Sequence, residues 1–197
     1  MLERRRPSVP RWRLATPLRR PLGALLALAL AVAPLSPARA TDLDEYRVKS
    51  ALICSFARFA QWPAATAGAD TSVLRVMVLG DADVQQALRA IDGQQVGARR
   101  IRIEELPRSN DPAGADILFV AESERDRWSK VQLAMAGAPI LTIGEMNGFL
   151  ESGGIINLVK AEKKIRFYVN LDHARAAGVA LSSRILNLAS GVEGASR

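Results

Sequence analysis

The chain has one cysteine and one histidine, Cys54 and His173, and so offers little for nucleophilic or acid–base catalysis. Nothing in the sequence places one beside the other, as a nucleophile and its base must be. The patterns G-x-S-x-G, H-E-x-x-H and the P-loop, which position a nucleophile, zinc ligands or a phosphate cradle, do not occur. We therefore expect no catalytic residues, no cofactor and no metal site, and a hydrolase is the weakest of the functions considered.

One segment has the position, though not the composition, of a phosphate-binding loop. Residues 80–83, Gly-Asp-Ala-Asp, follow a strongly apolar run and precede a helical pattern, where a dinucleotide-binding fold places its glycine-rich turn. Only one glycine is present, and two carboxylates would repel a phosphate. The simpler interpretation is that Asp81 or Asp83 caps the following helix.

The single cysteine excludes a disulfide within the chain and any multi-cysteine zinc site. On a helical wheel Cys54 lies opposite Leu52 and Phe56, beside Arg58. It is either half-buried against another element or available for an intermolecular bridge. His173 is either a surface residue or a ligand contact or pH-sensitive interface residue.

Polar residues in the C-terminal part provide the candidate binding site. Asn157, Arg166 and Asn170 lie in or beside two predicted strands, and such groups must be hydrogen-bonded if they are buried. They either fix local structure, with Asn170 or Asp172 capping a helix, or line a pocket for a small anionic ligand. Trp62 is either a core residue or a stacking platform. The candidate residues for binding a ligand or a partner are Arg58, Trp62, Arg166, Asn170, Ser182, Ser183 and Arg184.

The first 40 residues are typical of a secretory signal peptide. Seven arginines lie in residues 1–20, about a dozen apolar residues cover 22–33, and Ala-Arg-Ala ends the segment at 38–40. The apolar run is shorter than the roughly 20 residues of a membrane-spanning helix, although a retained anchor is an alternative. We expect cleavage after Ala40, which leaves residues 41–197 as one periplasmic domain.

The basic charge of the whole chain belongs to this leader. The chain has 27 Lys and Arg against 20 Asp and Glu, but eight basic residues and one acidic residue lie in 1–40. Residues 41–197 therefore carry 19 of each and a formal net charge of zero. The basic clusters at 99–102 and 160–166 alternate along predicted strands. We interpret them as solvated strand faces and expect no nucleic-acid partner.

The elements that must position these residues alternate between helices and strands. Residues 43–62 predict a first helix that ends before Pro63, and a loop covers 64–72. Its apolar face holds Val48, Leu52, Phe56 and Phe59. The next strands are expected at 73–79, 99–106, 116–121 and 139–143, with helices at 82–91 and 124–135. This order implies parallel strands with right-handed crossovers, as in a doubly wound α/β sheet.

The pattern changes after Gly144. Strands at 155–159 and 165–169 flank a charged tip and predict an antiparallel hairpin, which the chain enters through Gly153 and Gly154. We expect structural roles for these two glycines and for Asn157. A last helix over 172–189 is interrupted near Gly178, and residues 190–197 are expected to form a loose tail.

Two blocks of the sequence carry a family resemblance. The first runs from Val48-Lys49-x-Ala51 through Phe56-Ala57-Arg58-Phe59-x-x-Trp62-Pro63. The second, which is more specific, contains Gly148-Phe149-Leu150-Glu151-x-Gly153-Gly154-Ile155-Ile156-Asn157, Ile165-Arg166-Phe167, Asn170-Leu171-Asp172-x-Ala174-x-x-Ala177-Gly178 and Ser182-Ser183-Arg184-x-Leu186-x-Leu188-Ala189. In this order and spacing, over nearly all of residues 41–197, they resemble the YfiR family of small periplasmic proteins.

The resemblance implies a non-enzymatic regulator that folds as a three-layer α/β sandwich and forms a homodimer. The best-known members bind the periplasmic sensor domain of an inner-membrane diguanylate cyclase and hold it off, which lowers cyclic di-GMP and restrains biofilm formation. Those members carry cysteine pairs, whereas Cys54 is alone here, and Cys54-Ser55 stands where an aromatic-Asn pair is frequent.

Two functional hypotheses follow, and they predict different surfaces. A repressor of a cyclase predicts an exposed apolar patch. The alternative is a domain that senses a small periplasmic molecule near Trp62, Arg166, Asn170 and Ser182, which predicts a concave pocket with converging polar groups.

Overall fold

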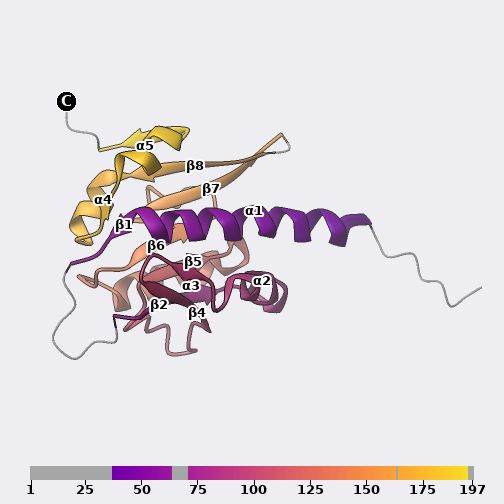
Figure 1. Ribbon diagram of the computed structural model, residues 1–197, viewed down its shortest axis with the longest axis horizontal. Coiled ribbons are helices and arrows are strands. Elements are labelled where there is room, and N and C mark those ends of the chain that lie inside the picture. Colours follow the sequence, from indigo (N-terminus) through magenta and orange to yellow (C-terminus); the bar gives the residue numbers. More distant parts are fainter. Residues whose placement is uncertain (1–36, 64–70, 163, 195–197) are drawn as a thin grey trace, which may run out of the picture. The chain divides into compact units, whose positions relative to one another are not determined.

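The computed structural model describes residues 37–63, 71–162 and 164–194, with side chains from residue 44 onward. The helices of this part are α1 (Pro37–Phe59), α2 (Ala82–Leu88), η1 (Arg89–Ile91), η2 (Glu122–Glu124), α3 (Arg125–Ala134), α4 (Leu171–Ala176) and α5 (Ser183–Leu188). The strands are β1 (Ala60–Gln61), β2 (Val73–Leu79), β3 (Gln95–Val96), β4 (Arg99–Glu105), β5 (Ile117–Val120), β6 (Leu141–Gly144), β7 (Ile156–Ala161), β8 (Lys164–Asn170), β9 (Ala180–Leu181) and β10 (Gly191–Glu193). Figure 1 shows their arrangement.

Within these residues the main sheet has eight strands in the order β10-β8-β7-β6-β5-β2-β4-β3. Strands β4, β2, β5, β6 and β7 run parallel to one another, whereas β3 is antiparallel to β4, and β7 and β8 form an antiparallel hairpin. The chain passes from β2 to β4 on one side and then crosses to β5 on the other. The predicted α/β fold, with a parallel Rossmann-like part and a C-terminal hairpin, is confirmed.

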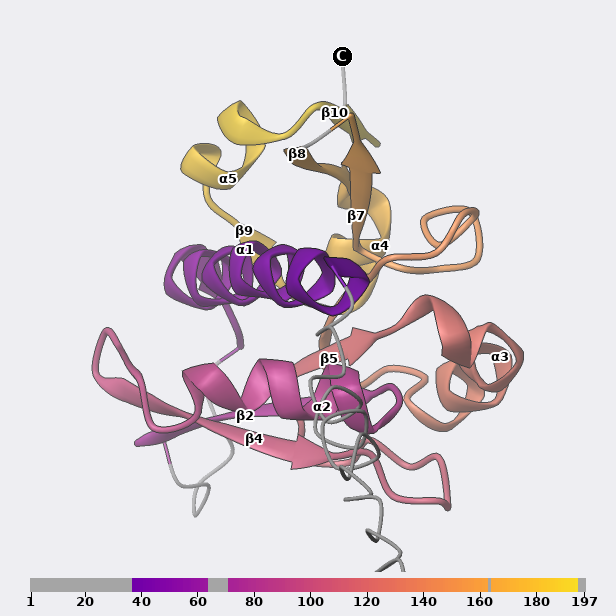
Figure 2. The same ribbon diagram turned by 90° about the vertical axis from the view of Figure 1, so that its right-hand side faces the viewer.

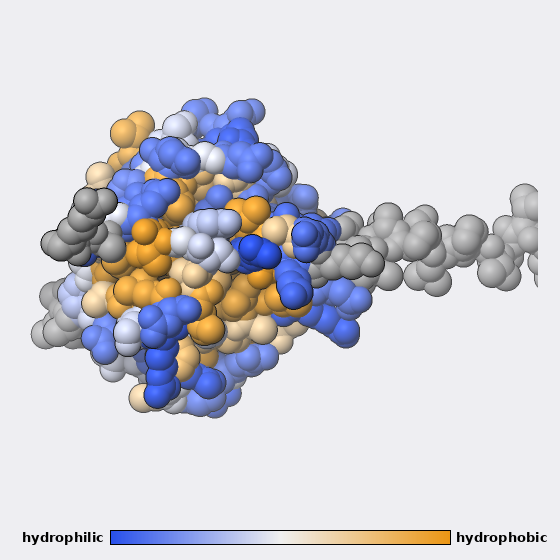
Figure 3. All heavy atoms as spheres, turned by 90° about the horizontal axis from the view of Figure 1, so that it is seen from above, coloured by the Kyte–Doolittle hydropathy of each residue, from blue (hydrophilic) through white to orange (hydrophobic). Residues whose placement is uncertain are grey.

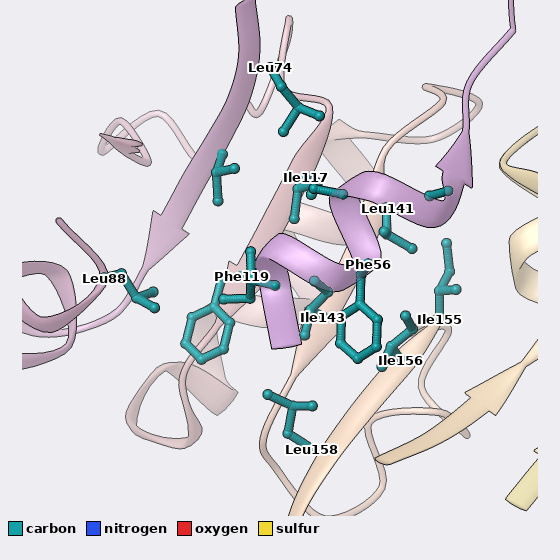
Figure 4. Packing of buried hydrophobic residues seen from close by; sticks show 14 of the residues in the cluster. Phe56, Leu74, Leu88, Ile117, Phe119, Leu141, Ile143, Ile155, Ile156 and Leu158 are labelled. Carbon is teal, nitrogen blue, oxygen red and sulfur yellow. The ribbon is translucent and has the colours of Figure 1, made fainter. Parts of the chain in front are cut away.

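Side chains of alternate residues in the central strands point to opposite faces of the sheet and pack into two separate cores. The sheet is therefore the middle one of three layers. Val76 and Val78 of β2 pack in a cluster with Phe56 of α1, whereas Met77 and Leu79 pack with Trp128 of α3. Figure 4 shows Phe56 pointing from α1 toward labelled isoleucines of β6 and β7. Its ring meets the edge of Phe167 at a centroid distance of 5.0 Å. Figure 2, which views α1 nearly end-on, shows β2 and β4 on one side of this helix and β7 and β8 on the other.

The prediction for the apolar face of the first helix was partly wrong. The buried side of α1 holds Ile53 and Phe56, with Lys49 also buried, whereas Val48 is 47% exposed. The face is rotated because Lys49 finds buried carboxylates to pair with. The helix also ends at Phe59, earlier than predicted, because Ala60 and Gln61 leave it as β1 and pair with β9.

The C-terminal part also differs from its prediction. The expected helix over 172–189 is two short helices, α4 and α5, separated by β9, with Gly178 at a φ of 69°. The expected loose tail is wrong for residues 191–193, which form β10 and pair in parallel with the open edge of β8. Residues 195–197 lie outside the described part, as do the loop at 64–70 and most of the predicted leader. None of the described helices is both long and apolar enough to span a membrane.

The glycines at the hairpin entry lie where a side chain would meet neighbouring atoms. A Cβ on Gly154 would lie 2.2 Å from Cδ1 of Phe149, and Gly153 has a φ of +94° with Gln132 against it. Phe149 is fully buried beside Trp128, with ring centroids 4.8 Å apart. The glycine pair therefore lets the backbone pass directly over a core aromatic ring.

Candidate functional site

A cavity with a volume of about 1190 Å³ lies at the carboxyl ends of the parallel strands. Asp81 follows β2, Glu122 follows β5, and Glu145 follows β6, and all three line it. Neighbouring β2 and β5 are followed by α2 and α3, which pack on opposite faces of the sheet. Such a reversal of strand order opens a crevice, and this is where doubly wound folds bind their ligands.

The N-terminal half of α1 forms one wall of this cavity, and β7 contributes another. Its charged lining residues are Asp44, Glu45, Arg47, Lys49, Asp81, Asp83, Glu122, Glu145 and Lys160. Its aliphatic lining residues are Val84, Ala87, Ala90, Ala121, Met146, Leu158 and Val159. Tyr46 is the one aromatic residue among the described lining.

A buried ion-pair network closes the side of the cavity formed by α1. Lys49 Nζ lies 2.5 Å from a carboxylate oxygen of Glu45 and 2.5 Å from one of Glu145. The side chains of Lys49 and Glu145 are 6% and 8% exposed. Lys160 from β7 also reaches Glu45 at 2.5 Å, and the Tyr46 hydroxyl donates to Glu145 at 2.9 Å. The network therefore ties α1 to the end of β6 and to the hairpin.

The electrostatics of this network shift the pKa values of Glu45 and Tyr46 in opposite directions. Burial alone would raise the pKa of Glu45, but the ammonium groups of Lys160 and Lys49 outweigh burial and hold that pKa below its ordinary value. Burial, and then the neighbouring Glu145, raise the pKa of Tyr46 well above its ordinary value, so its hydroxyl stays a donor. The positive charges of Lys49 and Lys160 thus neutralise the negative charges of Glu45 and Glu145.

The remaining charges of the lining are mostly acidic. Asp81 caps α2, as predicted, because its Oδ1 accepts from the Val84 amide at 3.0 Å. Asp83 is exposed and makes no hydrogen bond or ion pair with any other described residue. Six carboxylates against three cations leave the described lining with a net charge of −3. Such a cavity disfavours phosphate, in agreement with the sequence-based rejection of a phosphate loop.

Asn157 adds an unsatisfied polar group to the cavity lining. The residue is 8% exposed, and its Oδ1 is buried without a hydrogen-bond partner in the described part of the chain. Buried polar groups are rarely left unpaired, so each such atom calls for an explanation. The predicted structural role of Asn157 is therefore only part of its account.

The candidate binding residues from the sequence lie elsewhere, and several of them meet at the opposite end of α1. Arg58 is exposed on the last turn of this helix. The Ser182 amide donates to the Phe59 carbonyl at 3.1 Å, and the Arg184 guanidinium lies 5.3 Å from the Phe59 ring centroid. Ser183, which lies between Ser182 and Arg184 in the sequence, is the first residue of α5. The hydroxyl of Ser182 is buried without a partner among the described residues.

The other candidate residues have local partners. The Trp62 indole donates to the Asp116 carbonyl at 3.0 Å and is packed against the core, with the Arg99 guanidinium 5.5 Å from its ring. Asn170 caps α4 by accepting from the His173 amide at 3.0 Å. Arg166 is exposed on β8. The structure therefore brings residues 182–184 to Phe59, which follows Arg58 in the chain, and leaves Arg166 and Asn170 apart.

Cys54 and His173 have separate structural partners. Cys54 is half-buried, as expected, with Sγ 3.3 Å from Gln94 Oε1. Burial raises the pKa of its thiol, although the nearby Arg58 opposes this. His173 is also half-buried, with Nδ1 3.0 Å from the Gly154 carbonyl, so it is not the free surface residue expected. Among the described residues no group of three potential ligands could hold a metal ion.

An apolar face forms a second candidate surface. Figure 3 shows hydrophobic side chains gathered in the middle of the face seen from above, with hydrophilic ones at its rim. Apolar side chains that are exposed or only partly buried occur on three neighbouring elements, α1, β8 and α5. Val48 is 47% and Leu188 is 72% exposed. Leu52, Ile165 and Leu186 are only partly buried against the core. We call these five residues the apolar face.

Sequence reasoning missed the cavity at the strand ends. Tyr46, Lys49 and Glu145 come from segments almost a hundred residues apart in the chain. A usable signal was nevertheless present, because predicted parallel strands end before Asp81, Glu122 and Glu145. Carboxyl ends of neighbouring parallel strands lie at one edge of a sheet. Without the strand order, however, the sequence did not show which ends are adjacent.

The doubly wound sheet, the cavity at its strand ends and the apolar face define a small α/β binding domain. A family model described as YfiR/HmsC-like matches residues 46–190, and the chain belongs to this family. The family resemblance found in the sequence is thereby confirmed.

Solved structures add only a distant likeness. A conserved domain protein from Vibrio cholerae O1 biovar El Tor is 12% identical, with a TM-score of 0.48 over 62% of this chain and 55% of that one. An ABC domain in complex with L-Trp from Streptococcus pneumoniae is 10% identical, with a TM-score of 0.48 over 61% and 56%. This chain thus spans little more than half the length of either. The search of curated proteins found no match.

Proposed function

We propose that this protein binds the periplasmic sensor domain of an inner-membrane diguanylate cyclase and represses it, so that cyclic di-GMP falls and biofilm formation is restrained. The observation that carries the proposal is the family match over residues 46–190, which covers nearly all of the described chain. The predicted signal peptide would deliver residues 41–197 to the compartment in which such a sensor domain lies.

The apolar face supports this proposal as the docking surface. Exposed apolar groups cost free energy in water, and a contiguous set of them on one face marks an interaction site. Arg184 lies against the Phe59 ring at the end of α1, where Arg58 is exposed, and arginine is enriched among residues that anchor protein interfaces. We propose that Arg58, Trp62 and residues 182–184 contribute to partner binding at this end, and that Arg166 and Asn170 contribute separately from β8. The same face is our candidate for a homodimer contact.

The second candidate function is sensing of a small periplasmic molecule. The cavity at the strand ends supports it, because it is concave and has converging polar groups. The two functions are compatible, since a ligand that binds one state of the protein better would shift a repressor between free and bound forms.

A capture experiment tests the repressor proposal. Residues 41–197 are immobilised, detergent-solubilised inner membrane is passed over them, and retained proteins are identified by mass spectrometry. The variant Leu188→Glu places a charge on the apolar face, and Leu133→Glu is its control, because Leu133 is 80% exposed on α3. We expect the wild type and Leu133→Glu to retain a diguanylate cyclase, and Leu188→Glu to lose it.

Two outcomes would count against the proposal. If no protein with a diguanylate cyclase domain is retained by the wild type, the repressor function is wrong. If Leu188→Glu retains the cyclase as well as Leu133→Glu does, the repressor function stands but the apolar face is not the docking surface.

A further inference from the structure

We propose that the cavity at the carboxyl ends of β2, β5 and β6 binds a small aliphatic polyamine, a compound with two or three ammonium groups on a methylene chain. This inference does not depend on the cyclase partner, because it rests on the lining of the cavity alone. Three independent features of the lining lead to it.

The first feature is the distribution of carboxylates. Glu45 and Glu145 are already neutralised by Lys49 and Lys160, so they do not need a ligand. The acidic excess therefore falls on the other four carboxylates. They come from three separate segments, namely helix α1, the β2–α2 junction and the start of η2: Asp44, Asp81, Asp83 and Glu122.

These four carboxylates are only weakly compensated within the protein. Asp44 and Glu122 each meet an arginine at 3.5 Å on an exposed surface, which is a weak interaction. Asp81 uses one oxygen to cap α2, and Asp83 has no partner among the described residues. Carboxylates spread around one cavity favour a ligand with more than one positive charge over a single ammonium ion.

The second feature is the apolar part of the lining, which selects methylene groups. Val84, Met146 and Leu158 offer aliphatic surface between the charged positions. Tyr46, the one aromatic residue in the described lining, has its hydroxyl bound to Glu145. No pair of aromatic rings is present there to stack on a planar ligand, so flexible hydrocarbon between the ammonium groups fits better.

The third feature is Asn157, whose buried Oδ1 has no hydrogen-bond partner in the described part of the chain. Asn157 lines the same cavity and is 8% exposed. A carbonyl oxygen in this position accepts a hydrogen bond, and an ammonium group donates several. A polyamine would therefore satisfy the orphaned acceptor as well as the carboxylates.

Isothermal titration calorimetry of residues 41–197 with spermidine, at near-physiological salt, tests the proposal. We expect one spermidine to bind per chain and citrate, the anionic control, to give no binding heat. Asp83→Asn should weaken spermidine binding by about 1.4- to fivefold, the range expected for one exposed ion pair. Asn157→Leu should weaken it by roughly tenfold, through the loss of a charged hydrogen bond.

Asp126→Asn is the matched control for Asp83→Asn. Asp83 and Asp126 are both exposed in the first turn of a helix, α2 and α3, but only Asp83 lines the cavity. We expect Asp126→Asn to bind spermidine like the wild type. If Asn157→Leu unfolds, the comparison of the two aspartate variants decides the matter.

Three results would overturn the inference. Absence of spermidine binding excludes the polyamine. Equal weakening by Asp83→Asn and Asp126→Asn would show attraction to the overall charge and no defined site. Binding unchanged by Asp83→Asn would place the polyamine elsewhere. Each result is separate from the outcome of the membrane capture, since no cyclase is present in the titration.

Discussion

Replacing Lys49 by methionine should destabilise the protein strongly, although lysine is usually a surface residue. The Lys49 side chain is 6% exposed, and its ammonium group is the shared partner of Glu45 and Glu145. Methionine keeps the length and packing of the side chain but removes the charge. Glu145, which is only 8% exposed, would then hold a buried carboxylate without a cation.

The expected loss follows from the groups that remain. Removing one partner of a buried ion pair costs about 3–5 kcal/mol. Glu45 keeps Lys160, and Glu145 keeps the Tyr46 hydroxyl, so we expect the lower end, about 3 kcal/mol. For a domain of this size, each kcal/mol lowers Tm by roughly 2–4 °C, which gives a fall of about 6–12 °C.

Urea unfolding of residues 41–197, followed by tryptophan fluorescence, measures this loss. The double variant Lys49→Met/Glu145→Gln should recover much of the stability, because a neutral amide no longer needs a cation. Lys130→Met, at an exposed position of α3, is the control and should unfold within about 0.5 kcal/mol of the wild type. A Lys49→Met protein as stable as the control would refute the assignment of Lys49 as the buried link between α1 and β6.

Three further expectations concern other parts of the fold. Gly154→Val should lower Tm sharply or prevent soluble expression, because its Cβ would lie 2.2 Å from the Phe149 ring; an unchanged calorimetric transition would contradict this. Asn170→Ala should cost about 1 kcal/mol in chemical denaturation through loss of the α4 cap, and a neutral result would show that the cap is dispensable. The stability from Glu45 should be fully present above its ordinary pKa of 4.5 and be lost as pH falls through the lower pKa of the folded state; Glu45→Gln should flatten that part of a pH titration of Tm.

The elements that the sequence predicted well are those whose pattern is set by local burial. Strand β2 is apolar except for Arg75 because both of its faces are covered over most of its length, and its limits agree with the predicted 73–79. The alternation of β4 matches its place near the edge of the sheet, with only the two-residue β3 beyond it. In these segments the local pattern of apolar and polar residues indicates which side chains are buried. The prediction therefore does not depend on a contact with a distant part of the chain.

The elements that the sequence did not predict are short strands created by a distant partner. β1 and β9 have two residues each, and each exists because the other lies beside it. Residues 191–193 form β10 because β8 has an open edge with which they can pair. The local sequence pattern of residues 191–193 does not indicate this pairing. Propensity over two or three residues is too weak a signal against such tertiary contacts.

The binding cavity was hidden for a related reason, which Lys49 illustrates. In a helical pattern a lysine next to Val48 is assigned to the solvent side, since burying a lone ammonium group is costly. Here the cost is offset by Glu145, 96 residues later in the chain, and so the helix turns Lys49 inward and Val48 outward. The same rotation builds both candidate surfaces, because it places charged side chains on the cavity wall and leaves an apolar residue exposed. Local periodicity alone cannot yield this result, since the deciding contact depends on the order of strands in the sheet.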